Sequence, residues 1–67
     1  MDLNDCAPYQ HVDGSISAIG PDMTATLYQD RWQMWSCRMT YKDELVEVHR
    51  QLSTEAAFNA AWRKHVS

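Results

Sequence analysis

Apolar and polar residues alternate along residues 32–51, and the period of the pattern then changes. From Trp35 to Tyr41 every second residue is apolar, and Val46 and Val48 continue the alternation. From Ser53 onward, apolar residues recur at every third or fourth position. A period of two is typical of a half-buried strand, and a period near 3.6 is typical of an amphipathic helix. The second half of the chain therefore predicts a β-hairpin that leads into a helix.

The first half of the chain predicts further strands joined by short turns. Met23–Gln29 is rich in residues that favour strands. Asp13-Gly14 predicts a two-residue hairpin turn, because both residues tolerate the positive φ that such a turn needs. Gly20-Pro21-Asp22 marks a break, and Asp30-Arg31 and Lys42-Asp43-Glu44 predict polar turns. Short connections normally join neighbouring strands, so we expect an antiparallel meander.

The helix has a recognisable start and an apolar stripe. Ser53 is suited to cap the first turn, and Glu55 complements the positive end of the helix dipole. Leu52 is placed to pack on Ala57 as a hydrophobic staple. The stripe at helical spacing consists of Phe58, Ala61, Trp62 and His65.

These patterns predict one α+β domain over residues 1–67, with three to four antiparallel strands and one C-terminal helix packed on one face of the sheet. We expect the core to contain the apolar residues that fall on the inward faces of these elements. They are Leu27, Trp35, Cys37, Met39, Tyr41, Val46, Val48, Phe58, Ala61 and Trp62.

Length and charge limit the classes of protein that fit. A chain of 67 residues is only marginally stable alone, so a partner, a metal or a disulfide often adds order. Residues 1–30 hold five aspartates and no Lys or Arg, whereas residues 31–67 hold six basic and four acidic residues. The two parts therefore carry formal charges of −5 and +2. Such asymmetry indicates an interaction surface unless the fold interleaves the charges.

The chain start shows no signal peptide, and no apolar run is long enough to cross a membrane. We therefore expect a cytoplasmic protein without a membrane partner. In a reducing compartment Cys6 and Cys37 are expected to be free thiols, with a disulfide as the less favoured alternative.

No pattern of catalytic, metal-binding or cofactor-binding residues is present, so we expect no enzyme, no metal and no cofactor. His11, His49 and His65 lack the paired spacing of zinc ligands. Cys37 and His49 fall on neighbouring predicted strands, but Cys37 is on the core face, where a thiol is unreactive.

Protein binding is the class that the sequence favours. Trp32 and Met34 fall on the face of the predicted strand 32–41 that Ser36, Arg38 and Thr40 mark as solvent-facing. Aromatic residues, Met and Arg are enriched in interface cores. The predicted partner-binding residues are Tyr28, Arg31, Trp32, Met34 and Arg38. In the alternative, the N-terminal segment covers Trp32 and Met34.

Small acidic domains without an active site are often inhibitors or adaptors, and phages and other mobile elements encode many of them. Inhibitors of CRISPR effectors belong to this class, and the comparison rests on size and architecture alone. The leading prediction is a non-enzymatic protein that blocks a surface of a larger host complex. The alternative is a nucleic-acid-binding accessory protein that uses Trp, Tyr and Arg on the sheet. The oligomeric state is left open.

Overall fold

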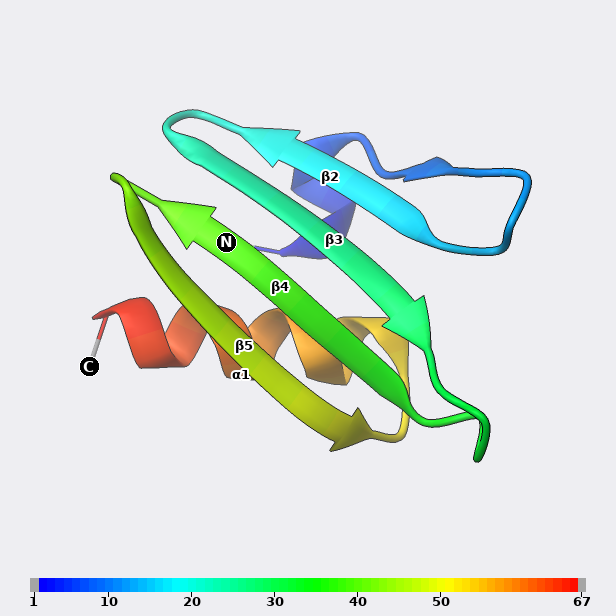
Figure 1. Cartoon of the computed structure of the whole chain (residues 1–67). Coiled ribbons are helices and arrows are strands. Elements are labelled where there is room, and N and C mark those ends of the chain that lie inside the picture. The colour runs from blue at the N-terminus through cyan, green and yellow to red at the C-terminus, as the bar shows by residue number, and fades with distance from the viewer. Residues whose placement is uncertain (1, 67) are drawn as a thin grey trace.

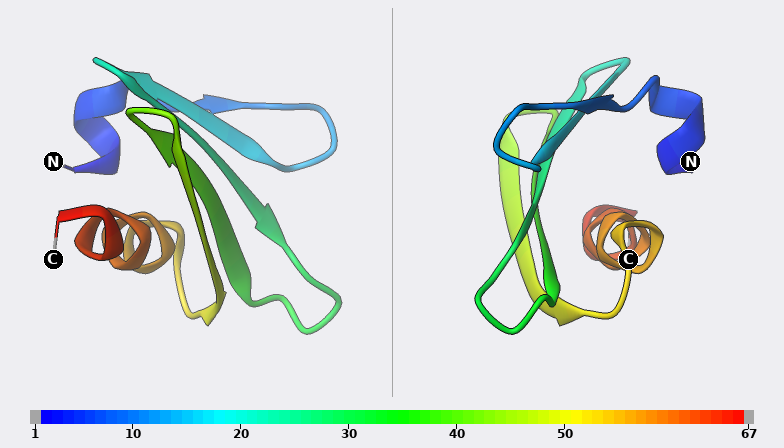
Figure 2. Two further views of the ribbon diagram at one scale, coloured as in Figure 1. Left: turned by 60° about the vertical axis from the view of Figure 1, so that its left-hand side comes forward. Right: turned by 90° about the vertical axis from the view of Figure 1, so that its right-hand side faces the viewer.

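The fold is a curved five-stranded antiparallel sheet with one helix on its concave side (Figures 1 and 2). The computed structural model describes residues 2–66. In chain order the elements are the 3-10 helix η1 (Leu3–Cys6), the strands β1 (Tyr9–Gln10), β2 (Ile16–Gly20), β3 (Met23–Gln29), β4 (Trp35–Tyr41) and β5 (Glu44–Gln51), and the helix α1 (Thr54–Val66). Each strand pairs with its neighbour in sequence. The predicted α+β meander with a C-terminal helix is confirmed, but the sheet has five strands rather than three to four.

The additional strand comes from the N-terminal hairpin, where β1 contributes only two residues. The predicted two-residue turn at Asp13-Gly14 is wrong, because residues 11–15 all lie between β1 and β2. The amide of Gly14 donates to the carbonyl of His11 at 3.0 Å, and Gly14 has φ +92°. The carboxylate of Asp13 accepts hydrogen bonds from the amide and hydroxyl of Ser15 at 2.9 and 2.7 Å. The turn is thus held by a side chain and needs positive φ only at the glycine.

Two of the other turns lie where the sequence predicts them. Pro21 and Asp22 form a two-residue connection between β2 and β3, with Asp22 at φ +58°. Lys42 and Asp43 join β4 to β5 at φ +50° and +66°, the pair of positive angles that a type I′ turn requires. This conformation matches the twist of the two flanking strands, so the longest strands of the sheet meet without a bulge at this end.

The predicted strand over residues 32–41 begins three residues late. β4 starts at Trp35, because residues 30–34 form the β3–β4 turn. In this turn the amide of Asp30 donates to the carbonyl of Met34, and the amide of Gln33 donates to the carbonyl of Asp30, both at 3.0 Å. Gln33 has φ +62°. Trp32 and Met34 therefore interrupt the alternation because they belong to a turn and not to a strand.

The core lies between the concave face of the sheet and α1. All ten predicted core residues lie in it: Leu27, Cys37, Met39, Val48, Phe58 and Ala61 are buried, and Trp35, Tyr41, Val46 and Trp62 are half-buried. The prediction missed six buried residues, namely Leu3, Cys6, Ala18, Met23, Ala25 and Ala57. Three of these are alanines, whose small side chains weaken a hydrophobic pattern but allow a close approach of helix and sheet.

The helix begins as predicted, with the hydroxyl of Ser53 accepting a hydrogen bond from the amide of Ala56 at 3.1 Å. Near its other end, the rings of Trp62 and Tyr41 meet edge to face with centroids 4.9 Å apart. Nε2 of His65 donates to the carbonyl of Met39 at 3.3 Å. The predicted packing of Leu52 on the helix is wrong, since Leu52 is 84% exposed. The helix is thus anchored at its cap and along one stripe.

Both cysteines are buried free thiols: Cys37 belongs to β4, and Cys6 is the last residue of η1. The Cys37 side chain is fully buried, and this burial raises the pKa of its thiol from 9.0 to about 12. Between these two values the unfolded chain has lost the proton that the folded chain keeps. The free energy of unfolding must therefore fall as the pH rises through this range.

We expect urea denaturation at about pH 8 and about pH 10.5 to show this loss of stability in the wild-type protein. In Cys37→Ala the decline over the same interval should be smaller, because no thiol remains to ionise in the unfolded state. The Cys6 thiol, whose pKa burial also raises, is present in both proteins, so the difference between the two slopes isolates Cys37. Equal slopes would contradict the assignment.

Within residues 2–66, no helix is both long and apolar enough to cross a membrane.

Candidate functional site

One face of the sheet is left uncovered by the other elements within residues 2–66. We call this convex side, which points away from α1, the open face (Figure 2). Tyr28 of β3 and Arg38 of β4 lie on it, because they alternate with the buried Leu27, Cys37 and Met39. The β3–β4 turn projects away from the helix on this same side (Figure 2). All five predicted partner-binding residues are therefore on the side opposite α1.

Trp32 is the most prominent apolar group of this region, with 65% of its surface exposed. The guanidinium of Arg31 lies 4.8 Å from the centre of the Trp32 ring, within the range of a cation–π interaction. Met34, the last residue of the turn, is half-buried. The alternative, in which the N-terminal segment covers Trp32, is wrong: β1 pairs with β2 at one edge of the sheet, and η1 packs on β2 and α1.

The turn that presents Trp32 is held by one carboxylate. Oδ1 of Asp30 accepts hydrogen bonds from the amides of Trp32 and Met34 at 2.9 and 3.0 Å. The side-chain amide of Gln29 donates to the carbonyl of Gln33 at 3.1 Å. These bonds, with the two backbone bonds within the turn, fix the backbone on both sides of the indole. An exposed Trp on a fixed backbone loses little conformational freedom on binding.

Arg50 joins this region through an irregularity in β5. Val46 and Val48 face the core, so regular alternation would direct Arg50 there too, and a buried unpaired guanidinium is costly. The register of the β4–β5 ladder shifts by one residue instead, so that His49 and Arg50 together lie opposite Ser36. Arg50 takes φ +60° at this bulge. The shift keeps Arg50 out of the core and exposed to solvent.

An open cavity of about 300 Å³ lies where the turn and the bulge meet. Its lining consists of Trp32, Met34 and Arg50. We call Arg31, Trp32, Met34 and Arg50 the turn surface. The predicted partner-binding residues do not include Arg50, although one signal was present in the sequence: an arginine in the core phase of a strand indicates a bulge.

Arg38 and Tyr28 do not line this cavity. Nε of Arg38 donates to Oε1 of Glu47 at 3.1 Å, and Nε2 of His49 lies 3.4 Å from Oε2 of the same carboxylate. Nδ1 of His49 lies 3.1 Å from the hydroxyl oxygen of Ser36. A serine, a histidine and a carboxylate are thus connected, but Ser36 is only 2% exposed. Its hydroxyl is therefore inaccessible to a substrate. These contacts instead hold the side chains of Arg38, Glu47 and His49 in place on the open face.

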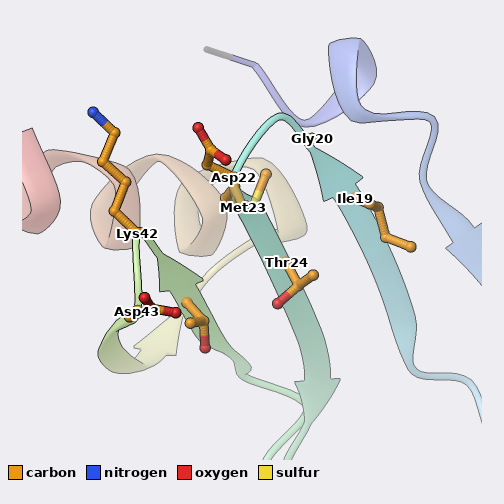
Figure 3. A pocket seen from close by; sticks show the side chains of 8 residues that line it. Ile19, Gly20, Asp22, Met23, Thr24, Lys42 and Asp43 are labelled. Atoms are coloured by element: carbon orange, nitrogen blue, oxygen red, sulfur yellow. The ribbon is translucent and has the colours of Figure 1, made fainter.

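A second, larger depression of about 640 Å³ lies at the other end of the sheet, between the β2–β3 and β4–β5 turns (Figure 3). Ile19 and Thr24 contribute to its lining, together with Asp22, Lys42 and Asp43. Figure 3 shows that the three charged side chains point in different directions rather than toward one point. Such a depression does not offer the convergent polar groups of a ligand site.

No group of three or more His, Cys, Asp or Glu residues that could hold a metal ion occurs in the described part of the chain. Cys37 and His49 do not form a reactive pair, because Cys37 faces the core and His49 contacts Ser36 on the open face.

Compared with known proteins, the chain matches no family model, no curated protein and no solved structure.

Proposed function

We propose that the chain is a non-enzymatic protein-binding module and that the turn surface is its binding site. The observation that carries the proposal is the exposed Trp32 beside a cavity, on a backbone held by the Asp30 carboxylate. Truncating a Trp buried at an interface commonly costs about 2 kcal/mol or more in binding. An indole left in water stabilises neither the monomer nor a complex.

Nucleic-acid binding through the sheet is the weaker candidate. Two aromatic residues of the sheet that this alternative needs at the surface, Trp35 and Tyr41, pack against the core on the helix side. Arg38 is paired with Glu47, and the formal charge of the chain is −3. A domain that binds phosphates normally gains affinity from a basic excess. A cytoplasmic inhibitor that blocks a larger host complex, as CRISPR inhibitors do, is the finer form of the proposal and stays a prediction.

The proposal is tested by affinity purification of tagged protein from its source cells, with and without nuclease. We expect a protein partner that nuclease does not remove and that the double variant Trp32→Ser, Met34→Ser no longer retains. The matched control is Leu45→Ser, Leu52→Ser, which removes two other exposed apolar side chains (53% and 84% exposed). This control should retain the partner. Both variants should unfold cooperatively, because none of the four side chains is fully buried.

Loss of the partner on nuclease treatment would favour nucleic acid. Equal retention by the wild type and by the turn-surface variant would contradict the proposed site.

A further inference from the structure

We propose that the turn surface recognises an acidic peptide segment that inserts one large apolar side chain between Trp32 and Arg50. This inference rests on the proposed function and specifies the chemistry of the partner at the same site. It follows from three features of the described residues, namely two arginines without an acidic partner, the apolar cavity that Arg50 lines, and the strained backbone at Arg50.

Two arginines of the turn surface lack an acidic partner. Among residues 2–66, the only ion pairs join Glu47 to Arg38 and to His49, so neither Arg31 nor Arg50 has a carboxylate within 4.0 Å. Asp30 directly precedes Arg31 in the sequence, but its Oδ1 accepts hydrogen bonds from two backbone amides of the turn. A chain of net charge −3 therefore presents a local positive site, and carboxylates are the groups that complement it.

The floor of the site is apolar. Trp32 and Met34 line the cavity of about 300 Å³ together with Arg50, and Arg31 covers the indole ring at 4.8 Å. A volume of this size accommodates one large side chain. Arg50 borders the cavity and Arg31 stacks on its Trp32 wall, so carboxylates that flank an apolar residue of the partner complement the two guanidinium groups. A nucleic-acid strand would instead need several phosphate contacts, and the aspartate-rich first half of the chain opposes them.

The backbone at Arg50 is strained, and the strain falls on a side chain of this site. A residue with a side chain at φ +60° is less stable than glycine in the same conformation. Glycine would form the same bulge without this cost, and yet it would leave the cavity without its cationic wall. The strained position therefore carries a cationic side chain that lines the cavity.

The test is selection of a random peptide display library on immobilised wild-type protein, with counter-selection on Arg50→Gly. We expect enriched peptides to carry Asp or Glu on both sides of a Leu, Phe or Trp. The affinity of the best of these, measured by fluorescence anisotropy, should fall about tenfold or more in Arg50→Gly. The same loss should follow when the peptide's acidic residues become Gln, or when its apolar residue becomes Ser.

Lys42→Gly is the matched control, because Lys42 also has positive φ (+50°) but lies at the opposite end of the sheet. Both glycine variants should melt at or above the wild-type temperature, and only Arg50→Gly should lose peptide affinity. Enrichment of neutral or basic peptides, absence of enrichment, or equal affinity in Arg50→Gly would overturn the inference. So would tight, steeply salt-dependent binding of an oligothymidylate probe that Arg50→Gly abolishes.

Failure of this inference is distinguishable from failure of the proposed function. If the peptides show no acidic preference while the Trp32→Ser, Met34→Ser variant still loses its cellular partner, only the acidic chemistry is wrong. If the partner is also retained by that variant, the turn surface is not the binding site.

Discussion

Replacing Phe58 by alanine is expected to abolish the cooperative thermal transition of the protein. Phe58 is fully buried, and it lies at the centre of the stripe by which α1 packs on the sheet. Truncating a buried Phe costs about 3–5 kcal/mol, which is comparable with the whole stability of a domain this small. Circular dichroism during heating measures the effect directly.

Trp62→Ala is the informative comparison for Phe58→Ala. Trp62 was expected to be an equal anchor, but its side chain is only half-buried and meets Tyr41 edge to face. We expect a lower melting temperature with a transition still visible. Val66→Ala, at a position 58% exposed, should change little. A Phe58→Ala protein that melts like the wild type would show that the helix does not dock on the sheet as described.

The second large effect is expected at Leu27, in the middle of β3. Leu27 is fully buried beneath the helix layer, whereas Leu45 on β5 is 53% exposed on the open face. Leu27→Ala should reduce the free energy of unfolding by about 2–5 kcal/mol, through lost burial and the cavity that remains. Leu45→Ala removes the same atoms from a solvated site and should cost much less. Urea denaturation of the two variants measures the loss in the free energy of unfolding when the same side-chain atoms are removed from the core face and from the open face.

The periodicity of the sequence was sufficient to predict the second half of the fold. Alternation in β4 assigned its core face correctly, and the serine before the helix located its start. Both signals are local, because they depend on residues one to four positions apart. Ser36 was predicted to face solvent but is only 2% exposed, because its hydroxyl lies against the His49 ring. The prediction of the N-terminal hairpin was less accurate. Strand β1 has only two residues, and the turn after it is held by the Asp13 carboxylate rather than by the backbone conformation of Asp13-Gly14 alone.

The cavity could be predicted only in part. Trp32 and Met34 were identified because they break an alternating pattern, although the reason is a turn and not an exposed strand face. Arg50 was missed because its position depends on a register shift between two strands, which is a tertiary event. The pairing of Arg38 with Glu47 was also hidden, since the two residues meet only across the ladder.

The helix that covers the core follows all five strands in the chain, and this order has a consequence during synthesis. Each strand can pair with the one before it as the chain emerges from the ribosome, because the loops to be closed are short. Apart from the part of β2 that η1 contacts, the concave face of the nascent sheet nevertheless stays uncovered until Thr54–Val66 has left the exit tunnel. Until then the chain presents an apolar surface to chaperones and to other nascent chains. Arrival of the helix is the step that converts an aggregation-prone sheet into a protected domain.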